Sequence, residues 1–353
     1  MRAAVLLRTG GTAAAAVLLL LLAERTLNEY HLRLLNVVGI NVILATSLNL
    51  TNGFTGIFSL GHAGFMAVGA YAGTLLTFPV ARKAMLLPDL PRWLAQVEWP
   101  FLPALLAGGA LAALAAVAVG WPVLRLRGHY LAVATLGFMV IVQVLATNLD
   151  RYTRGALGIN GIPPYTTLWW VAACVAATLV VLGHLLDSGV GRALRAVRDD
   201  DLVAQALGIP VARYRLGALT LGAFFAGVAG VLWAHLITVI SPGAFSFLLT
   251  FQIVVMVVVG GMGSLSGSVV AAVLLTLVPE GLRRLEQGAV VAGLTIPPLF
   301  GLSQIVLACA LVLVMIYRPA GLLGQAEVGW RHLRHLRDLR QRRLPAREAE
   351  ERG

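Results

Sequence analysis

The sequence predicts an all-α protein that crosses a membrane many times. Of its 353 residues, 59% are hydrophobic and only 12% are charged, which is about half the charged fraction of a typical soluble domain. Apolar runs recur from one end of the chain to the other. Their lengths approach the roughly 20 residues that a helix needs to cross a hydrocarbon core. We therefore expect a polytopic bundle of transmembrane helices.

Ten apolar runs have about the length of a membrane span. They cover residues 3–23, 34–51, 58–78, 101–120, 129–148, 167–186, 215–238, 247–262, 264–279 and 300–317. The first follows Arg2 as a signal peptide would, but Leu21 stands where a signal peptidase needs a small residue, so we expect an uncleaved span. The sixth run opens a second set of five, and two sets of five spans would be related by inversion in the membrane plane.

The distribution of basic residues predicts the orientation of the chain. With ten spans both termini share a side, and placing them inside gives the inner segments 18 basic residues and the outer segments nine. An excess of Lys and Arg marks the cytoplasmic side. Eight of the inner arginines belong to the tail at 325–353, and without them the margin is 10 to 9. We expect cytoplasmic termini, with the tail held near anionic lipid rather than nucleic acid.

The outer connection at 79–100 contains four prolines. Proline removes a backbone donor and disrupts a helix interior, so we do not expect one regular helix there.

Motifs for catalysis and for metal binding are absent from the sequence. The only lysine, Lys83, lies between Arg82 and Ala84, so it cannot belong to a P-loop, which requires Gly-Lys-Ser/Thr. Cys174 and Cys309 both lie in apolar runs. We therefore expect no enzyme and no bound cofactor or metal. No predicted span carries a carboxylate near its middle, which disfavours coupling to a proton gradient, although sodium coupling through backbone carbonyls stays open.

The longest polar interruption, 188–210, has the signals of two short helices joined at a corner. Ser188 can cap the first helix, on which three arginines follow at intervals of three residues. The acidic run 199–201 favours the start of a second helix, 202–207. Gly208 can end that helix in the left-handed conformation, and Pro210 prevents its continuation. Either this is an ordinary interfacial loop, or it presents charges to a partner.

Three intramembrane stretches contain residues that are unusual in a span. Residues 49–73 are rich in small residues, which permit either tight helix packing or a broken helix that lines a path. Residues 257–273 contain four glycines and form either a structural hairpin or part of a gate. In 128–148, Gln143 either bonds to a neighbouring helix or faces a pore.

Together, these stretches resemble the LivM-type permease subunits of branched-chain amino-acid ABC importers. The resemblance runs in order from about residue 36 to 324, and leaves 1–35 and 325–353 without a family signal. The matching pieces are NLTNGFTGIFSLGHAGFMAVGAY, GHYLAVATLGF, GALGINGIP, SGVGRALRAVRDDDLVAQALGIPVARYRLGALTLGAFFAGVAGVL, VVGGMGSLSGSVVAA and IYRPAGLLG.

The resemblance implies a fold, partners and a location. It implies a permease transmembrane domain over 36–324 in a bacterial cytoplasmic membrane. The domain would pair with a second permease subunit, two cytoplasmic ATPase subunits that hold ATP and Mg, and an extracytoplasmic binding protein. The loop at 188–214 would dock on an ATPase. Its docking residues would be Arg192, Arg195, Arg198, Asp199, Asp200, Asp201, Ala204, Leu207 and Gly208.

The sequence also offers candidates for the translocation path and for the substrate. Candidate residues for the path are Ser59, Gly61, His62, Thr135, Gln143, Gly260, Gly261 and Gly263. The resemblance implies branched-chain or other small amino acids as substrates. Related permeases for urea or short amides, and a stand-alone secondary transporter, are the alternatives.

Overall fold

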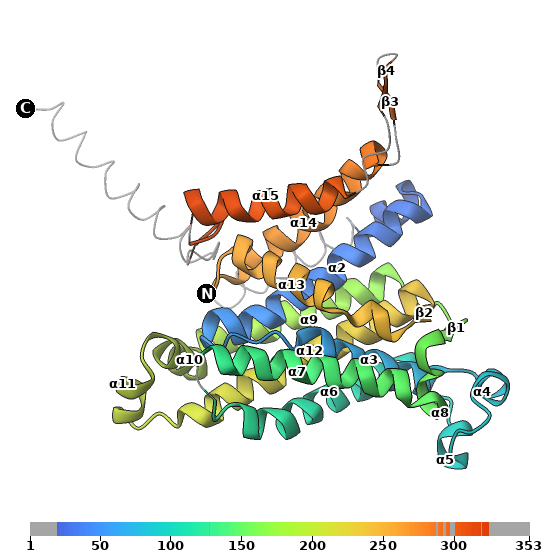
Figure 1. Cartoon of the computed structure of the whole chain (residues 1–353), viewed down its shortest axis with the longest axis horizontal. Helices are drawn as coiled ribbons and strands as arrows, with labels where there is room; N and C mark the ends of the chain where they lie inside the picture. Colours follow the sequence, from blue (N-terminus) through green and yellow to red (C-terminus); the bar gives the residue numbers. More distant parts are fainter. Residues whose placement is uncertain are drawn as a thin grey trace, which may run out of the picture.

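A computed structural model describes residues 20–126, 128–286, 289–291, 294–296, 301–318 and 320–324. The described chain is a bundle of long helices that run between two ends (Figure 1). They are α2 (Glu29–Asn49), α3 (His62–Thr77), α6 (Phe101–Val123), α7 (His129–Asn148), α9 (Leu168–Asp187), α12 (Val211–Ile237), α13 (Phe247–Gly260), α14 (Leu265–Glu286) and α15 (Leu302–Tyr317).

These helices match the predicted spans from residue 34 onward, although the total of ten is not confirmed. Within the described residues, seven helices are long and apolar enough to cross a membrane. An eighth is counted if α3 and the short α4 (Val80–Leu86), which meet at a bend of 115°, form one span. The shorter α15 is a 16-residue apolar helix, and the predicted span at 3–23 falls almost wholly outside the described residues.

Glycine contacts hold α3, α6 and α12 together at the centre of the bundle. A methyl carbon added at Gly69 would lie 2.3 Å from Cα of Gly227, and one added at Gly108 would lie 2.9 Å from the carbonyl oxygen of Gly69. A methyl carbon at Gly73 would lie 2.5 Å from a methyl group of Val231. Gly69 and Gly73 therefore serve close helix packing, one of the two interpretations that the sequence allowed.

The two ends of the bundle carry different short elements (Figure 1). One end holds α10 (Gly189–Asp199) and α11 (Asp201–Ala206). The opposite end holds α4, α5 (Arg92–Ala95), α8 (Asp150–Thr153), η2 (Gly155–Leu157) and the paired strands β1 (Ile159–Asn160) and β2 (Val239–Ile240). The proline-rich connection at 79–100 thus contains two short helices and is not one regular helix, as its prolines predicted.

Lys83 fixes this proline-rich connection. Its side chain is fully buried, and Nζ donates hydrogen bonds to the carbonyl oxygens of Leu94, at 3.1 Å, and of Val97.

The remaining elements are small. A π-helix, η1 (Leu50–Phe54), extends α2, and a 3-10 turn, η3 (Pro242–Phe245), precedes α13. Strands β3 (Ala289–Val291) and β4 (Leu294–Ile296) form an antiparallel hairpin. The tail at 325–353 lies outside the described residues. The cytoplasmic placement of the termini stays a prediction, as does the inverted relation between two sets of five spans.

Candidate coupling and translocation site

The helix–corner–helix predicted at 188–210 is confirmed. The Ser188 hydroxyl accepts a hydrogen bond from the backbone N–H of Val190 at 3.1 Å and caps α10. Asp200 occupies the corner in an extended conformation, and its carboxylate accepts the N–H groups of Leu202 and Val203 at the start of α11. Gly208 follows α11 with φ of 80°, the left-handed value that favours glycine.

Three polar contacts attach this helix pair to the rest of the chain. Arg195 donates to the carbonyl oxygen of Leu186, at the end of α9, at 2.9 Å. Asp201 forms an ion pair with Arg215 of α12 at 2.7 Å. Arg198 donates from Nη1 to the carbonyl oxygen of Gly53 in η1 at 3.3 Å. The structure thus turns Arg195, Arg198 and Asp201 toward the bundle, whereas the resemblance implied that they belong to the docking face.

The exposed surface of the helix pair is more apolar than the sequence suggested. Leu202, Val203 and Leu207 are exposed to 68%, 56% and 73%, whereas Ala204 is buried at 1%. Exposed polar members of the predicted set are Arg192, Asp199 and Asp200, and Gly208 is also exposed. The sequence places Leu202 and Val203 on the second helix but does not show that they are exposed, because exposure depends on how α11 packs.

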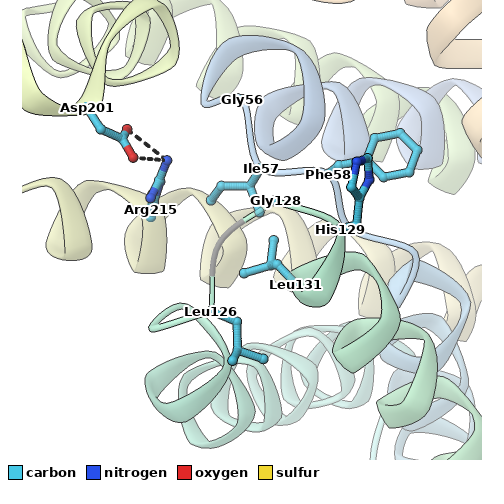
Figure 2. A pocket seen from close by; sticks show the side chains of 9 residues that line it. All are labelled: Gly56, Ile57, Phe58, Leu126, Gly128, His129, Leu131, Asp201 and Arg215. Carbon is cyan, nitrogen blue, oxygen red and sulfur yellow. Dashed lines mark hydrogen bonds and ion pairs between the residues drawn. The ribbon is translucent and has the colours of Figure 1, made fainter.

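A cavity of about 390 Å³ lies beside this helix pair. Figure 2 shows the Asp201–Arg215 pair on one side of it and Phe58 with His129 on the other. Its remaining walls are largely apolar and come from the loop before α3 and the turn between α6 and α7. The cavity therefore separates the Asp201–Arg215 attachment from the start of α7.

Four of the predicted path residues come together around the loop that precedes α3. The N–H of Leu60 donates to Thr135 Oγ1 at 2.9 Å, and a methyl carbon added at Gly61 would lie 2.8 Å from the Thr135 carbonyl oxygen. His62 Nε2 lies 2.8 Å from Ser47 Oγ. Ser59 is buried, like Gly61, His62 and Thr135. These polar groups thus bond within the chain, and a role in lining a path stays a prediction.

Gln143 is not part of this cluster. It lies on α7 eight residues beyond Thr135, which is about 12 Å along a helix. Its side chain is half-buried, and its backbone carbonyl accepts a hydrogen bond from Thr147 Oγ1 at 2.8 Å.

The glycine-rich stretch predicted at 257–273 contains the junction of α13 and α14, and Asn49 holds this junction. Gly261 and Gly263 have φ of 113° and 90°, values that only glycine adopts readily. Asn49 is fully buried and accepts the N–H of Gly263 at 2.9 Å. Its amide also donates to Ser264 O at 2.8 Å and to Ser268 Oγ at 2.7 Å. Gly260 packs closely against Gly267, because a methyl carbon added at Gly260 would lie 2.5 Å from the carbonyl oxygen of Gly267.

Arg198 brings the helix pair to this same junction. A methyl carbon added at Gly263 would lie 2.7 Å from Arg198 Nη1, and one at Gly56 would lie 3.1 Å from Arg198 Cγ. Asn49 and Asn52 were missed by the sequence analysis, although both are amides within an apolar run and amides in spans commonly bond other segments. Asn52 bonds the backbone of Ser59 through both its amide nitrogen and its oxygen. The stretches 49–61, 188–210 and 257–267 therefore meet in one place.

Comparison with known proteins identifies the family to which these segments belong. The chain matches the family described as "Branched-chain amino acid transport system / permease component" over residues 30–317. The chain belongs to this permease family. It is accordingly a multi-pass protein of the inner membrane.

The relatives of this permease include proteins named LivM and LivH. It is 33% identical over 318 residues to the high-affinity branched-chain amino acid transport system permease protein LivM of Escherichia coli (strain K12), covering 80% of this chain and 68% of the relative. It is 25% identical to a probable LivM protein of Methanocaldococcus jannaschii over 82% of this chain and 92% of the relative. It is 23% identical to the LivH permease protein of Escherichia coli (strain K12), with coverage of 81% and 92%. No solved structure matches the permease.

Proposed function

We propose that this chain is one of two permease subunits of an ABC importer for branched-chain or other small amino acids. A binding protein on the outer side would deliver the substrate, and two cytoplasmic ATPase subunits would supply the energy by hydrolysing ATP with Mg. The similarity to both LivM and LivH supports a pair of related permeases. The observation that carries the proposal is the capped helix pair α10–α11, which is exposed at one end of the bundle and bonded to it.

The docking surface for the ATPase would combine apolar and charged side chains. Leu202, Val203 and Leu207 are large exposed apolar residues at this end of the molecule, and Arg192 and Asp199 are exposed on α10, the helix that precedes them. Specific protein interfaces commonly combine a buried apolar core with a polar rim. Ala204 faces inward and would set the position of α11 rather than touch the partner.

Arg198 would transmit movement of the docked ATPase to the membrane domain. It contacts Gly53 and Gly263, and Asn49 joins the segments that contain these two glycines. A displacement of α10 would therefore act on the junction of α13 and α14. Coupling of this kind requires a contiguous set of packed and hydrogen-bonded groups, and these contacts supply one.

Capture of the ATPase subunits tests the docking surface. Leu207→Asp places a charge in the proposed contact, so we expect loss of ATPase co-purification. Leu157→Asp is the matched control, because Leu157 is exposed to 78%, against 73% for Leu207, and lies at the opposite end of the bundle. Capture that survives Leu207→Asp and Leu202→Asp together would contradict the assignment.

A further inference from the structure

A second cavity lies at the end of the bundle opposite α10 and α11. It has a volume of about 300 Å³ and lies among α2, α3, α12, α13 and α14. The beginning of α2 and the last turns of α14 form its mouth, and both lie far from α10 and α11 in Figure 1. None of the residues assigned to docking or to the translocation path lines it.

The mouth of this cavity carries charges of both signs. Glu280 accepts a hydrogen bond from Tyr30 and forms an ion pair with Arg283 at 3.1 Å. Both contacts use Oε1, so Oε2 has no partner among the described residues. Arg33 also lines the mouth, is exposed, and forms no ion pair within the described part of the chain. A carboxylate oxygen and a guanidinium that have no partner within the described residues thus face one small space.

The interior of the cavity is apolar with a polar floor. Its apolar lining includes Leu34, Val37, Met66 and Leu275. Asn41 and Thr276 also line it and bond each other, Nδ2 to Oγ1, at 2.9 Å. Small-molecule sites are commonly of this kind, with apolar walls and a few polar groups that fix the orientation of the ligand.

We propose that this cavity binds one zwitterionic aliphatic amino acid. Arg33 would hold the carboxylate, Glu280 would accept a hydrogen bond from the ammonium group, and the branched side chain would lie against Leu34 and Val37. Charge-assisted hydrogen bonds of this type are stronger than neutral ones. The volume of about 300 Å³ is at the lower limit for ligand pockets and suits a ligand of this size. The site rests on the proposed importer function and gives this chain its own contact with the substrate.

The cavity is also linked, through two helices, to the end of the bundle that carries α10 and α11. The cavity lies between α2 and α14, and Asn49 joins the other end of α2 to the first turn of α14. A ligand at the mouth would therefore contact α2 and α14. Arg198 contacts Gly53 and Gly263, which lie next to the opposite ends of these two helices.

The test uses radiolabelled L-leucine and the purified assembly of both permeases and both ATPases, without binding protein. We expect saturable binding that weakens about tenfold or more in Glu280→Gln and in Arg33→Gln, because each loses one charged contact. Glu29→Gln and Arg25→Gln are the matched controls, since both residues are exposed near the start of α2 and neither lines the cavity. Isopentylamine and 4-methylpentanoate, which each lack one charge of leucine, should compete at least tenfold less well than leucine.

Two results would overturn the site. One is leucine binding that is absent, or equal in Glu280→Gln and in the wild type. The other is a phospholipid that occupies the cavity, seen by native mass spectrometry as a bound lipid that Arg33→Gln releases. ATPase capture is measured with the same tagged permease pair, on which leucine binding is also measured before the ATPases are added. Capture without leucine binding contradicts the cavity alone, whereas leucine binding without capture contradicts the importer proposal alone.

Discussion

Replacing Asn49 by alanine should destabilise the membrane domain more than other single amide substitutions. The Asn49 side chain is fully buried and makes three hydrogen bonds of 2.9 Å or less across the junction of α13 and α14. Alanine removes all three and leaves the N–H of Gly263 without its partner. Ser264 O keeps other donors, because the N–H and the hydroxyl of Ser268 both bond it at 3.2 Å.

The magnitude follows from these contacts. Each lost hydrogen bond costs roughly 1 kcal/mol, and an unpaired buried N–H costs about 1–3 kcal/mol in place of its own bond. The expected loss of unfolding free energy for Asn49→Ala is therefore about 3–5 kcal/mol. With the usual entropy of unfolding per residue, a chain of 353 residues would lose about 4–7 °C in Tm.

Thermal unfolding of the purified permease, followed by tryptophan fluorescence, measures this shift. Asn148→Ala is the matched control, since Asn148 is exposed and its amide bonds only the Val144 carbonyl oxygen of its own helix. We expect the control to change Tm by less than about 1 °C. A Tm of Asn49→Ala within about 1 °C of the wild type would refute the assignment of Asn49 as the residue that holds the junction.

Three further predictions concern other contacts of the structure. Arg198→Ala should keep ATPase capture but lower ATP-dependent uptake at least tenfold, and wild-type uptake by this variant would contradict the proposed transmission. Gly69→Ala should lower Tm, because the added methyl carbon would lie 2.3 Å from the backbone of α12, whereas Gly217→Ala, with open space around it, should leave Tm unchanged or raise it. An amine-reactive reagent should modify Lys83 only after unfolding, since Nζ is buried and bonded to two carbonyl oxygens; mass spectrometry that finds the modification in folded protein would disprove that burial.

Local chemistry explains why much of the fold was predictable. Apolar runs define the helices of the bundle because length and hydropathy alone decide whether a helix suits a membrane. The caps of α10 and α11 were also predictable, since Ser188 and Gly208 act on backbone groups only a few residues away. The prolines of 79–100 likewise predicted that this connection is not one regular helix.

The contacts between distant segments could not be predicted in this way. Asn49 and Gly263 are separated by more than 200 residues, and an amide in an apolar run does not specify its partner. The spacing of Arg195 and Arg198 indicated one side of α10 but not whether that side faces the bundle. Exposure of Leu202 and Val203 likewise depends on how α11 rests on Ala204, which is a tertiary feature.

Reconstitution in proteoliposomes tests the central proposal most directly. This chain would be combined with a LivH-type permease, two ATPase subunits and a branched-chain amino-acid binding protein. Leucine-loaded binding protein should stimulate ATP hydrolysis and drive ATP-dependent leucine uptake, and this chain alone should give no uptake. Leucine uptake by this chain alone, without ATPase subunits or ATP, would contradict the importer assignment and indicate a secondary transporter.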